Sequence, residues 1–451
     1  MKKHDVDMLS GSITKGLWAI SLPIMAMNVM TSLFGIIDMT ILKNFCTDGN
    51  AVGAVGVCGA LIAFCTNLAS GLTTGANVIV ARNIGRGDKE SVDKAIGVSV
   101  AFSIVLGLVF AVVGVCGARQ LLVWNNCPEE LLADASLYFR LYFAGVPILL
   151  IYYFFAAILR ASGDSRRPML FSLASGALKA VLSFVFTAVF QMGVAGVAYA
   201  TILSWAVLGI CGLLALVKNQ GAVRLKSQYL RFYGKELRQV LHIGVPDGLQ
   251  RAMFSFANVL ITSAVNSFGP AATTGVSIAN NFDGILYNIC TAAAMAVMPY
   301  VSQNVGRGNI TRATQSVWKG VWITTVLGVS FGTLSALFSG PLSSIMTSDP
   351  EAIAYSQQKM VIISTTYFIC GINDIFGSAL RGMGRPMVAT VCSLIYLCGL
   401  RTFWVYFVFP LLPNMTFLYL VWPISWVLCI VTTLFFYFPT VKKLMAKAAS
   451  V

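Results

Sequence analysis

Twelve long apolar segments constrain the fold of this chain more than any other feature of its sequence. They cover residues 16–42, 51–81, 95–118, 137–159, 169–190, 193–217, 240–266, 271–301, 317–338, 360–380, 387–409 and 416–438. A helix needs about 20 predominantly apolar residues to cross the hydrocarbon core of a bilayer, and each segment meets that length. The runs are continuous, whereas a membrane β-barrel would show shorter segments of alternating polarity. We therefore expect an all-α polytopic membrane protein with twelve transmembrane helices.

The composition excludes a soluble protein of several domains. Hydrophobic residues make up 57% of the 451 residues and charged residues only 11%, whereas soluble domains carry about 25% charge. The polar connectors between the segments are short, and the longest of them, 218–239, falls at the middle of the chain. The first segment is too long for the apolar core of a signal peptide, so we interpret it as a retained span.

The distribution of positive charge predicts the topology. The chain has 31 Lys and Arg against 17 Asp and Glu, a net charge of +14. Twenty-four of the basic residues fall in the two tails and in or at the edges of the connectors after even-numbered spans, and only four, Lys359 among them, fall in or at the edges of the other connectors. Because cytoplasmic loops are enriched in Lys and Arg, both termini are expected in the cytoplasm. The charge indicates orientation and contact with membrane lipids, and no nucleic-acid partner is expected.

The two halves of the chain repeat each other. The sequence RNIGRGD at 82–88 recurs as QNVGRGN at 303–309, and the LR-x-x-G pattern at 159–163 recurs at 380–384. Each half holds six spans, so both copies begin on the same side of the membrane. We therefore expect two six-helix lobes, 1–217 and 240–451, related by a pseudo-two-fold axis along the membrane normal and joined by the cytoplasmic connector 218–239.

Seven Asp, Lys and Arg residues lie inside the apolar segments at least four positions from either end, where each is unfavourable by about 2.5–3.5 kcal/mol. They are the acids Asp38, Asp247, Asp283 and Asp374 and the bases Lys179, Arg251 and Arg401. Asp247 and Arg251 are four residues apart and are predicted to form a local ion pair. The other acids either tie helices together or take part in function: a poorly hydrated carboxylate can take up a proton, or hold Na⁺ with the help of Asn and Thr oxygens.

Two prolines and several long side chains are further candidates for function. Pro23 and Pro246 occupy corresponding positions early in spans 1 and 7, where each interrupts helical hydrogen bonding and provides a candidate hinge; prolines without a switching role are equally common in membrane helices. Asn280, Asn281, Met295 and Met298 are candidates for the wall of a substrate cavity. For the methionines, packing against lipid is the alternative to an adaptable binding surface.

The chain resembles the multidrug and toxic compound extrusion (MATE) family, in particular its bacterial DinF-like branch. The resemblance covers all twelve spans in order and is carried by the following residues: Leu22-Pro23-Ile24 with Asp38, Gly71-Leu72-Thr73-Thr74-Gly75-Ala76, Asn83-x-Gly85-x-Gly87-Asp88, Gly193-Val194-Ala195-Gly196-Val197-Ala198, Gly244-Val245-Pro246, Gln303-Asn304-x-Gly306 and Leu380-Arg381-Gly382-x-Gly384.

The resemblance implies a secondary transporter in which H⁺ or Na⁺ enters while an amphiphilic, often cationic, small molecule leaves. It implies a monomer in the bacterial cytoplasmic membrane, with no enzymatic activity and no cofactor besides the coupling ion. Asp38 and Thr201 match a coupling cluster of the amino-terminal lobe. Asp283 and Asp374 match acids of the carboxyl-terminal lobe, and either is a candidate Na⁺ ligand.

The chain also departs from the family pattern. Lys179 and Ser183 stand in span 5 where related transporters often have Asn and Asp, and Phe254 stands where one branch has a glutamate. We expect Lys179 to pair with Asp38, which shifts the coupling role toward the carboxyl-terminal lobe. The alternative function is a lipid or lipid-linked oligosaccharide flippase of the same superfamily. The intramembrane bases keep this alternative open, while the twelve spans disfavour it.

Overall fold

The predicted all-helical membrane fold is confirmed. The computed structural model describes residues 6–46, 51–219 and 221–450, and these residues form helices joined by short turns, without strands. Eleven helices of this described part are long and apolar enough to cross a membrane. The twelfth expected span corresponds to α7 (Gly234–Asn266), a helix of 33 residues that contains Asp247 and Arg251. Most of the long helices extend beyond the apolar runs, because polar residues at their ends continue the helical conformation.

The described chain divides into two compact units. Unit 1 comprises residues 26–84 and 88–244, and unit 2 comprises 6–25, 85–87 and the residues from 245 onward. The predicted lobe boundaries at 218–239 stay a prediction; as packed, the first half of the first helix belongs to unit 2.

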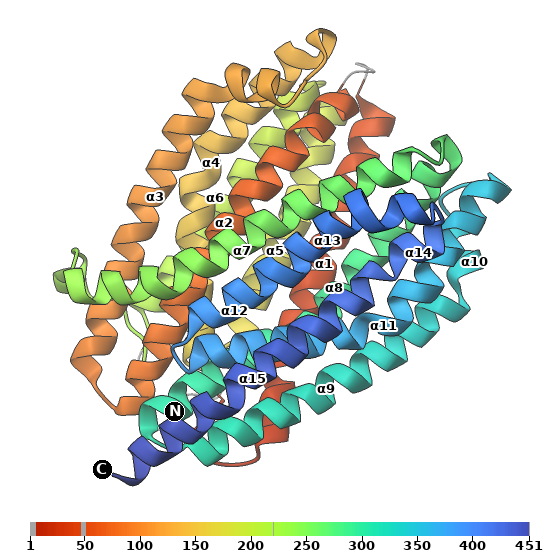
Figure 1. The fold of residues 1–451 in the computed structure, drawn as a ribbon. Helices are drawn as coiled ribbons and strands as arrows, with labels where there is room; N and C mark the ends of the chain where they lie inside the picture. Colours follow the sequence, from red (N-terminus) through yellow and green to blue (C-terminus); the bar gives the residue numbers. More distant parts are fainter. Residues whose placement is uncertain (1–5, 47–50, 220, 451) are drawn as a thin grey trace. The chain divides into compact units, whose positions relative to one another are not determined.

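Unit 1 is built around α4, which packs against α3 and α6. The α-helices of the first half of the chain are labelled in Figure 1. In chain order the elements are α1 (Ile13–Phe45), α2 (Ala51–Arg86), α3 (Lys89–Trp124), α4 (Glu129–Ala161), α5 (Arg166–Phe184), the π-helical η1 (Val185–Val189), α6 (Gly193–Val217) and the 3₁₀ turn η2 (Ser227–Tyr229).

Unit 2 is built in the same way around α11, which packs against α8, α9 and α15 (Figure 1). After α7 its elements are α8 (Pro270–Arg307), α9 (Ile310–Leu337), α10 (Ser339–Ser344), α11 (Pro350–Gly382), α12 (Pro386–Ser393), the π-helical η3 (Leu394–Gly399), α13 (Leu400–Phe403), the π-helical η4 (Trp404–Val408), the 3₁₀ turn η5 (Phe409–Leu411), α14 (Met415–Tyr419) and α15 (Val421–Ala449).

The turns between α2 and α3 and between α8 and α9 show the internal repeat at atomic level. Gly87 and Gly308 both have positive φ angles, 75° and 84°, which favour glycine because it lacks a Cβ. The next residue in each turn caps the following helix: Asp88 accepts the N–H of Ser91 at 3.0 Å, and Asn309 accepts the N–H of Arg312 at 3.0 Å. The Ser91 hydroxyl also donates to Asp88, and these hydrogen bonds lower the pKa of the Asp88 carboxyl.

A second pair of matching turns follows α4 and α11. Gly163 and Gly384 have φ angles of 94° and 84°. In each turn the glycine N–H bonds the carbonyl three residues earlier, that of Arg160 or Arg381, at 3.0 Å. The two motifs recognised in the sequence therefore form the same helix-ending turns in both halves, which is the geometry expected of a repeat.

The amino-terminal segment is held to unit 2 by its backbone. Arg312 of α9 donates to the carbonyl oxygens of Met8, Ser10 and Gly11 at 3.0, 2.6 and 3.1 Å. Asn304 also donates to Met8, at 3.1 Å. Because all the acceptors are backbone carbonyl groups, these contacts depend on the backbone conformation of the segment and not on its side chains.

Replacing Gly85 by Val is expected to destabilise the protein. A Cβ atom at Gly85 would lie 1.9 Å from the carbonyl oxygen of Gln303. The backbones of α2 and α8 would therefore have to move apart at this contact. We expect the free energy of unfolding to fall by about 1–3 kcal/mol, as for other overpacked sites, measured as thermal unfolding in detergent. Gly59→Val is the matched control, since a Cβ there meets no atom within 4 Å. Equal unfolding temperatures for the two variants would contradict the close approach.

Candidate functional site

The intramembrane acid of unit 1 is paired with α5. Asp38 on α1 is 7% exposed and forms an ion pair with Lys179. Ser183, one turn further along α5, donates a hydrogen bond to the same carboxylate at 3.1 Å. The predicted pairing of Lys179 with Asp38 is therefore confirmed. The two α5 residues that depart from the family pattern are the partners of Asp38.

Thr201 does not join this cluster through its hydroxyl. The residue is buried in α6, and its Oγ1 donates to the carbonyl of Val197 in the same helix at 2.8 Å. A hydroxyl bonded to the preceding turn is a common arrangement in membrane helices. The hydroxyl of Thr201 is thus bonded within α6, and a coupling role for this residue stays a prediction.

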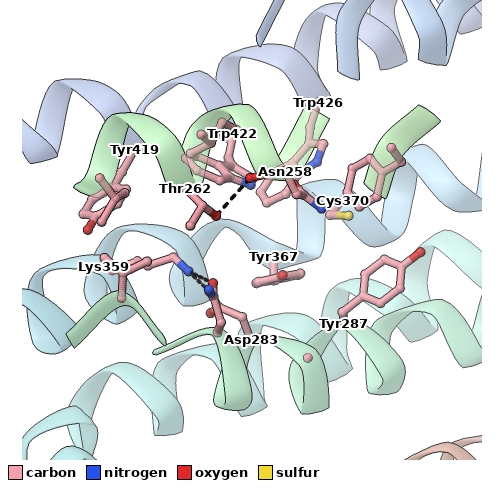
Figure 2. A pocket seen from close by; sticks show the side chains of 16 residues that line it. Asn258, Thr262, Asp283, Tyr287, Lys359, Tyr367, Cys370, Tyr419, Trp422 and Trp426 are labelled. Atoms are coloured by element: carbon pink, nitrogen blue, oxygen red, sulfur yellow. Dashed lines mark hydrogen bonds and ion pairs between the residues drawn. The ribbon is translucent and has the colours of Figure 1, made fainter. Parts of the chain in front are cut away.

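Unit 2 contains a cavity of about 300 Å³ between α7, α8, α11, α14 and α15. Figure 2 shows one acid, one lysine and a group of aromatic side chains around it. The lining residues are Phe254, Asn258, Ile261, Thr262, Val265, Val276, Asn280, Asp283, Gly284, Tyr287, Lys359, Tyr367, Cys370, Tyr419, Trp422 and Trp426. Its volume is at the lower end of the range found for small-molecule pockets.

Asp283 and Lys359 form a buried ion pair in this cavity. The Nζ of Lys359 lies 3.0 Å from Oδ2 of Asp283, and both side chains are less than a tenth exposed. Asn280, one turn before Asp283 on α8, accepts a hydrogen bond from the same ammonium. Figure 2 shows the Lys359 and Asp283 side chains pointing toward each other beside Tyr367. The ammonium is thus held by two oxygens from one helix face.

The rest of the cavity wall is aromatic and weakly polar. Tyr419 comes from α14, and Trp422 and Trp426 come from α15. On α7, the hydroxyl of Thr262 donates to the carbonyl of Asn258 at 3.0 Å, as drawn in Figure 2. Faces of aromatic rings attract cations and planar organic groups. The wall therefore offers apolar contact around a single acid–base pair.

Only one of the four predicted cavity residues lines this cavity. Asn280 does, whereas Asn281 is not among the lining residues and donates to the carbonyl of Ser277 at 3.0 Å. Neighbouring residues of a helix point about 100° apart, so the two asparagines face different surroundings. Met295 and Met298 lie roughly 18 Å or more beyond Asp283 along α8, where Met298 approaches Gly382. Asn281, Met295 and Met298 are not among the residues that line this cavity, and their role in a substrate cavity stays a prediction.

Arg401 is buried behind the aromatic wall. It is 0% exposed, and its Nε donates to the hydroxyl of Ser425 at 3.3 Å. The guanidinium carbon lies 5.3 Å from the ring centre of Phe254 and 5.5 Å from that of Trp422. Its Nη1 and Nη2 atoms have no hydrogen-bond partner in the described part of the chain. Phe254 therefore faces a cation on one side and the cavity on the other.

A second charge cluster in unit 2 centres on Asp247. Arg251 lies 3.1 Å from its Oδ2, so the predicted local pair is confirmed. Arg381 of α11 lies 2.8 Å from its Oδ1 and also donates to Gln250 at 2.7 Å. Asp374, half-buried on α11, interacts electrostatically with both arginines. The predicted ion pair is thus part of a network that joins α7 to α11.

Two buried basic residues beside the acids of unit 2 were missed by the sequence analysis. Lys359 was assigned to an outer connector and Arg381 to an inner one, whereas both lie inside α11 and are less than a tenth exposed. Lys359 borders the apolar run at its first residue, so hydropathy alone places it outside the span.

The two hinge candidates lie inside helices. Pro23 is in α1 and Pro246 is in α7. The division of the chain between the two units falls after Met25 and after Gly244, close to each proline. Their hinge role stays a prediction.

Comparison with known families adds the deciding observation. A model of the MatE family matches the chain twice, over residues 23–185 and 246–407. The protein belongs to the MatE family. Because the two matched stretches correspond to the two halves, the family model also supports the internal repeat. The protein is therefore a multi-pass membrane protein of a transporter family, as the resemblance implied.

Relatives from bacteria cover most of the chain. It is 28% identical over 399 residues to the "Probable multidrug resistance protein YpnP" of Bacillus subtilis (strain 168), covering 88% of each chain. It is 27% identical over 396 residues to the "Probable multidrug resistance protein NorM" of Thermotoga maritima, covering 85% of this chain and 83% of the relative. These relatives support a role in drug efflux.

Solved structures share the fold. A structure described as the outward-facing conformation of a multidrug resistance MATE family transporter matches with a TM-score of 0.90. The match covers 98% of this chain and 99% of that one at 20% sequence identity. At this identity the likeness establishes the twelve-helix fold and leaves the substrate open.

Proposed function

We propose that this MATE protein is a secondary active efflux transporter that exchanges H⁺ or Na⁺ for amphiphilic aromatic compounds, cationic ones among them, by alternating access. The observation that carries the proposal is the cavity of unit 2, in which an acid–base pair is surrounded by aromatic side chains. A neutral pair inside an apolar site can change its net charge by one unit when an ion arrives, which biases a two-state arrangement of helices.

The setting of the protein is part of the same proposal. We place it in the bacterial cytoplasmic membrane as a monomer, with both termini in the cytoplasm. The excess of Lys and Arg in the tails and in alternate connectors supports this orientation. Asp283 and Asp374 are the residues to which coupling is assigned, since both are acids within unit 2 and adjoin basic side chains.

The proposal is tested by dye transport in everted membrane vesicles. We expect uptake to stop when the gradient of the coupling ion is collapsed, by a protonophore for H⁺ or by a sodium ionophore for Na⁺. Asp283→Asn and Asp374→Asn should each lower ion-driven uptake to the level of vesicles without the protein. Asp349→Asn is the matched control, because Asp349 caps α11 on the surface and Asn caps helices as well. Unchanged uptake by both single variants would refute the coupling assignment.

The second candidate, a flippase for lipids or lipid-linked oligosaccharides, rests on the buried cations Lys359 and Arg401, which suit an anionic headgroup. The same experiment separates the two. Transport that is indifferent to both gradients would favour the flippase.

A further inference from the structure

One buried charge of unit 2 is not balanced by another. The charged side chains that this unit buries among its described residues are Asp247, Asp283, Lys359, Arg381 and Arg401. Asp283 is paired with Lys359, and Asp247 is paired with Arg381. Arg401 forms no ion pair with the described residues, and its Nη1 and Nη2 atoms have no hydrogen-bond partner among them. A single positive charge therefore remains beside the cavity.

The charge of Arg401 cannot be removed by loss of a proton, because arginine stays protonated in proteins. A buried charge without a partner is strongly unfavourable, so the guanidinium requires an anion. The side chains that interact with it electrostatically are Tyr367, Cys370, Cys398 and Cys429, and none of them is a carboxylate. Phenol and thiol groups can donate hydrogen bonds. These surroundings therefore suit an anion placed next to the guanidinium.

The corresponding cation of unit 1 has the partner that Arg401 lacks. Lys179 precedes Arg401 by 222 residues and is paired with the carboxylate of Asp38. The residue 223 positions after Asp38 is Ile261, which lines the cavity of unit 2. Where unit 1 has a carboxylate for its cation, unit 2 therefore has an apolar side chain at the wall of a cavity.

The cavity reaches the neighbourhood of Arg401. Phe254 and Trp422 line it, and the guanidinium carbon lies 5.3 and 5.5 Å from the centres of their rings. Cys370 and Trp422 are drawn on the cavity wall in Figure 2. Arg401 itself lies on α13, between the π-helical segments η3 and η4. Because π-helical turns are rare and occur frequently at functional sites, the local backbone also points to a binding role.

We propose that Arg401 is an anion-binding residue, and that its Nη1 and Nη2 atoms hold a monovalent anion, either chloride or the carboxylate of an aromatic compound. This anion takes the part in unit 2 that the Asp38 carboxylate has in unit 1. It reaches the guanidinium from the cavity when the ring of Phe254 or Trp422 rotates. The planar guanidinium suits such a ligand because it can donate two parallel hydrogen bonds. The inference goes beyond the proposed efflux function, since it assigns the cavity a ligand of negative charge.

The first test measures thermal unfolding of the full-length protein in detergent, in buffers of equal ionic strength that contain chloride or gluconate. A ligand that binds only the folded state raises stability as its concentration exceeds Kd. Gluconate is the reference because its many hydroxyl groups exclude it from an apolar cavity. We expect the unfolding midpoint of the wild-type protein to rise with chloride and that of Arg401→Met to stay constant. Arg140→Met, at an exposed position of α4, is the matched control and should keep the rise.

Ile261→Asp tests the comparison between the two units. The variant has a carboxylate at the position that corresponds to Asp38, so a tethered anion should neutralise Arg401 and abolish the response to chloride. Ile261→Asn is the matched control, because its side chain has a similar shape but no charge, and it should keep the response. A chloride response of the same size in Ile261→Asp and Ile261→Asn would overturn the proposal.

Benzoate distinguishes the two sources of the anion, with benzamide as the neutral compound of the same shape. We expect benzoate to raise the midpoint of the wild-type protein and benzamide to leave it unchanged. Arg401→Met should bind benzoate about tenfold more weakly, a loss typical of hydrogen bonds to charged groups. A response to benzoate alone would support a carboxylate ligand, and a response to chloride alone would support an inorganic one.

Three results would overturn the proposal. The first is a midpoint that responds to neither anion, and the second is an equal response of wild-type protein and Arg401→Met. The third is a response to phosphatidylglycerol alone, which would assign Arg401 to a lipid headgroup. A crystal structure determined with bromide should show anomalous scattering within hydrogen-bonding distance of Nη1 or Nη2 of Arg401. Bromide found at the protein surface alone would contradict the site.

The failures of the two proposals are distinguishable. Ion-driven dye uptake by a protein without an anion response would overturn the role of Arg401 and leave the efflux function standing. An anion response that depends on Arg401, in a protein without ion-driven dye uptake, would support the anion site and refute the efflux function.

Discussion

Asp247→Ala is expected to lower the free energy of unfolding by about 3–5 kcal/mol, the loss typical of removing one partner from a buried ion pair. Asp247 is 1% exposed and joins Arg251 on its own helix to Arg381 on α11. Without it, Arg381 keeps a hydrogen bond to Gln250 but loses its direct carboxylate contact. The loss is measured as the midpoint of thermal unfolding in detergent and as the yield of folded protein.

A double variant separates charge from packing. Asp247→Leu combined with Arg381→Met replaces the pair with apolar side chains of similar size, and such replacements are often neutral or stabilising. We expect the double variant to recover most of the stability that Asp247→Ala loses. Asp88→Ala is the control for an exposed acid, expected to lose about 1 kcal/mol through its helix cap. Equal stability of Asp247→Ala and wild-type protein would show that the network makes no net contribution.

The twelve helices and the repeat could be predicted because both depend on short stretches of sequence. Apolar length fixes the spans, and the glycines with positive φ recur at matching positions, Gly87 with Gly308 and Gly163 with Gly384. The capping residues Asp88 and Asn309 follow them in the same register. Such features act over a few residues, so they can be recognised without knowledge of the packing.

The cavity could not be predicted in the same way. Its acid, Asp283, was found because a charge in an apolar run is conspicuous, but its partner Lys359 lies at the border of a run, where lysines are expected to reach the membrane surface. The aromatic wall gave no signal, since Trp and Tyr are frequent in membrane helices. Only the packing of α14 and α15 on α11 brings Trp422 and Trp426 to the same site as Asp283.

The repeat also allows the intramembrane charges of the two units to be compared at corresponding positions. Arg401 follows Lys179 by 222 residues, close to the offset that relates the matching turns. In unit 1 the lysine pairs with Asp38, whereas Ile261 stands 223 residues after Asp38 in unit 2. The second half therefore has a cation on its fifth span and an isoleucine at the position that corresponds to Asp38. Its own acid–base pair comes from α8 and α11 instead.

Arg401→Met is expected to stabilise the protein while impairing transport. The guanidinium is 0% exposed, has one hydrogen bond, to Ser425, and leaves Nη1 and Nη2 without a partner in the described chain. Replacing a buried charge by an apolar side chain of similar length is favourable by up to about 4 kcal/mol in comparable cases. Methionine also packs well between aromatic rings, here those of Phe254 and Trp422. The midpoint of thermal unfolding should rise.

Transport should fall in the same variant, because Phe254 and Trp422 line the cavity and would lose the cation that orients their rings. Arg401→Lys keeps a charge but not the planar guanidinium that stacks on both rings, so it should lose transport without gaining stability. Ser425→Ala removes the hydrogen bond alone and serves as the control. A lower unfolding temperature for Arg401→Met would contradict the prediction, because it would mean that the guanidinium has favourable partners that offset its burial. A higher unfolding temperature together with a loss of transport would show that Arg401 destabilises the folded protein but is needed for transport.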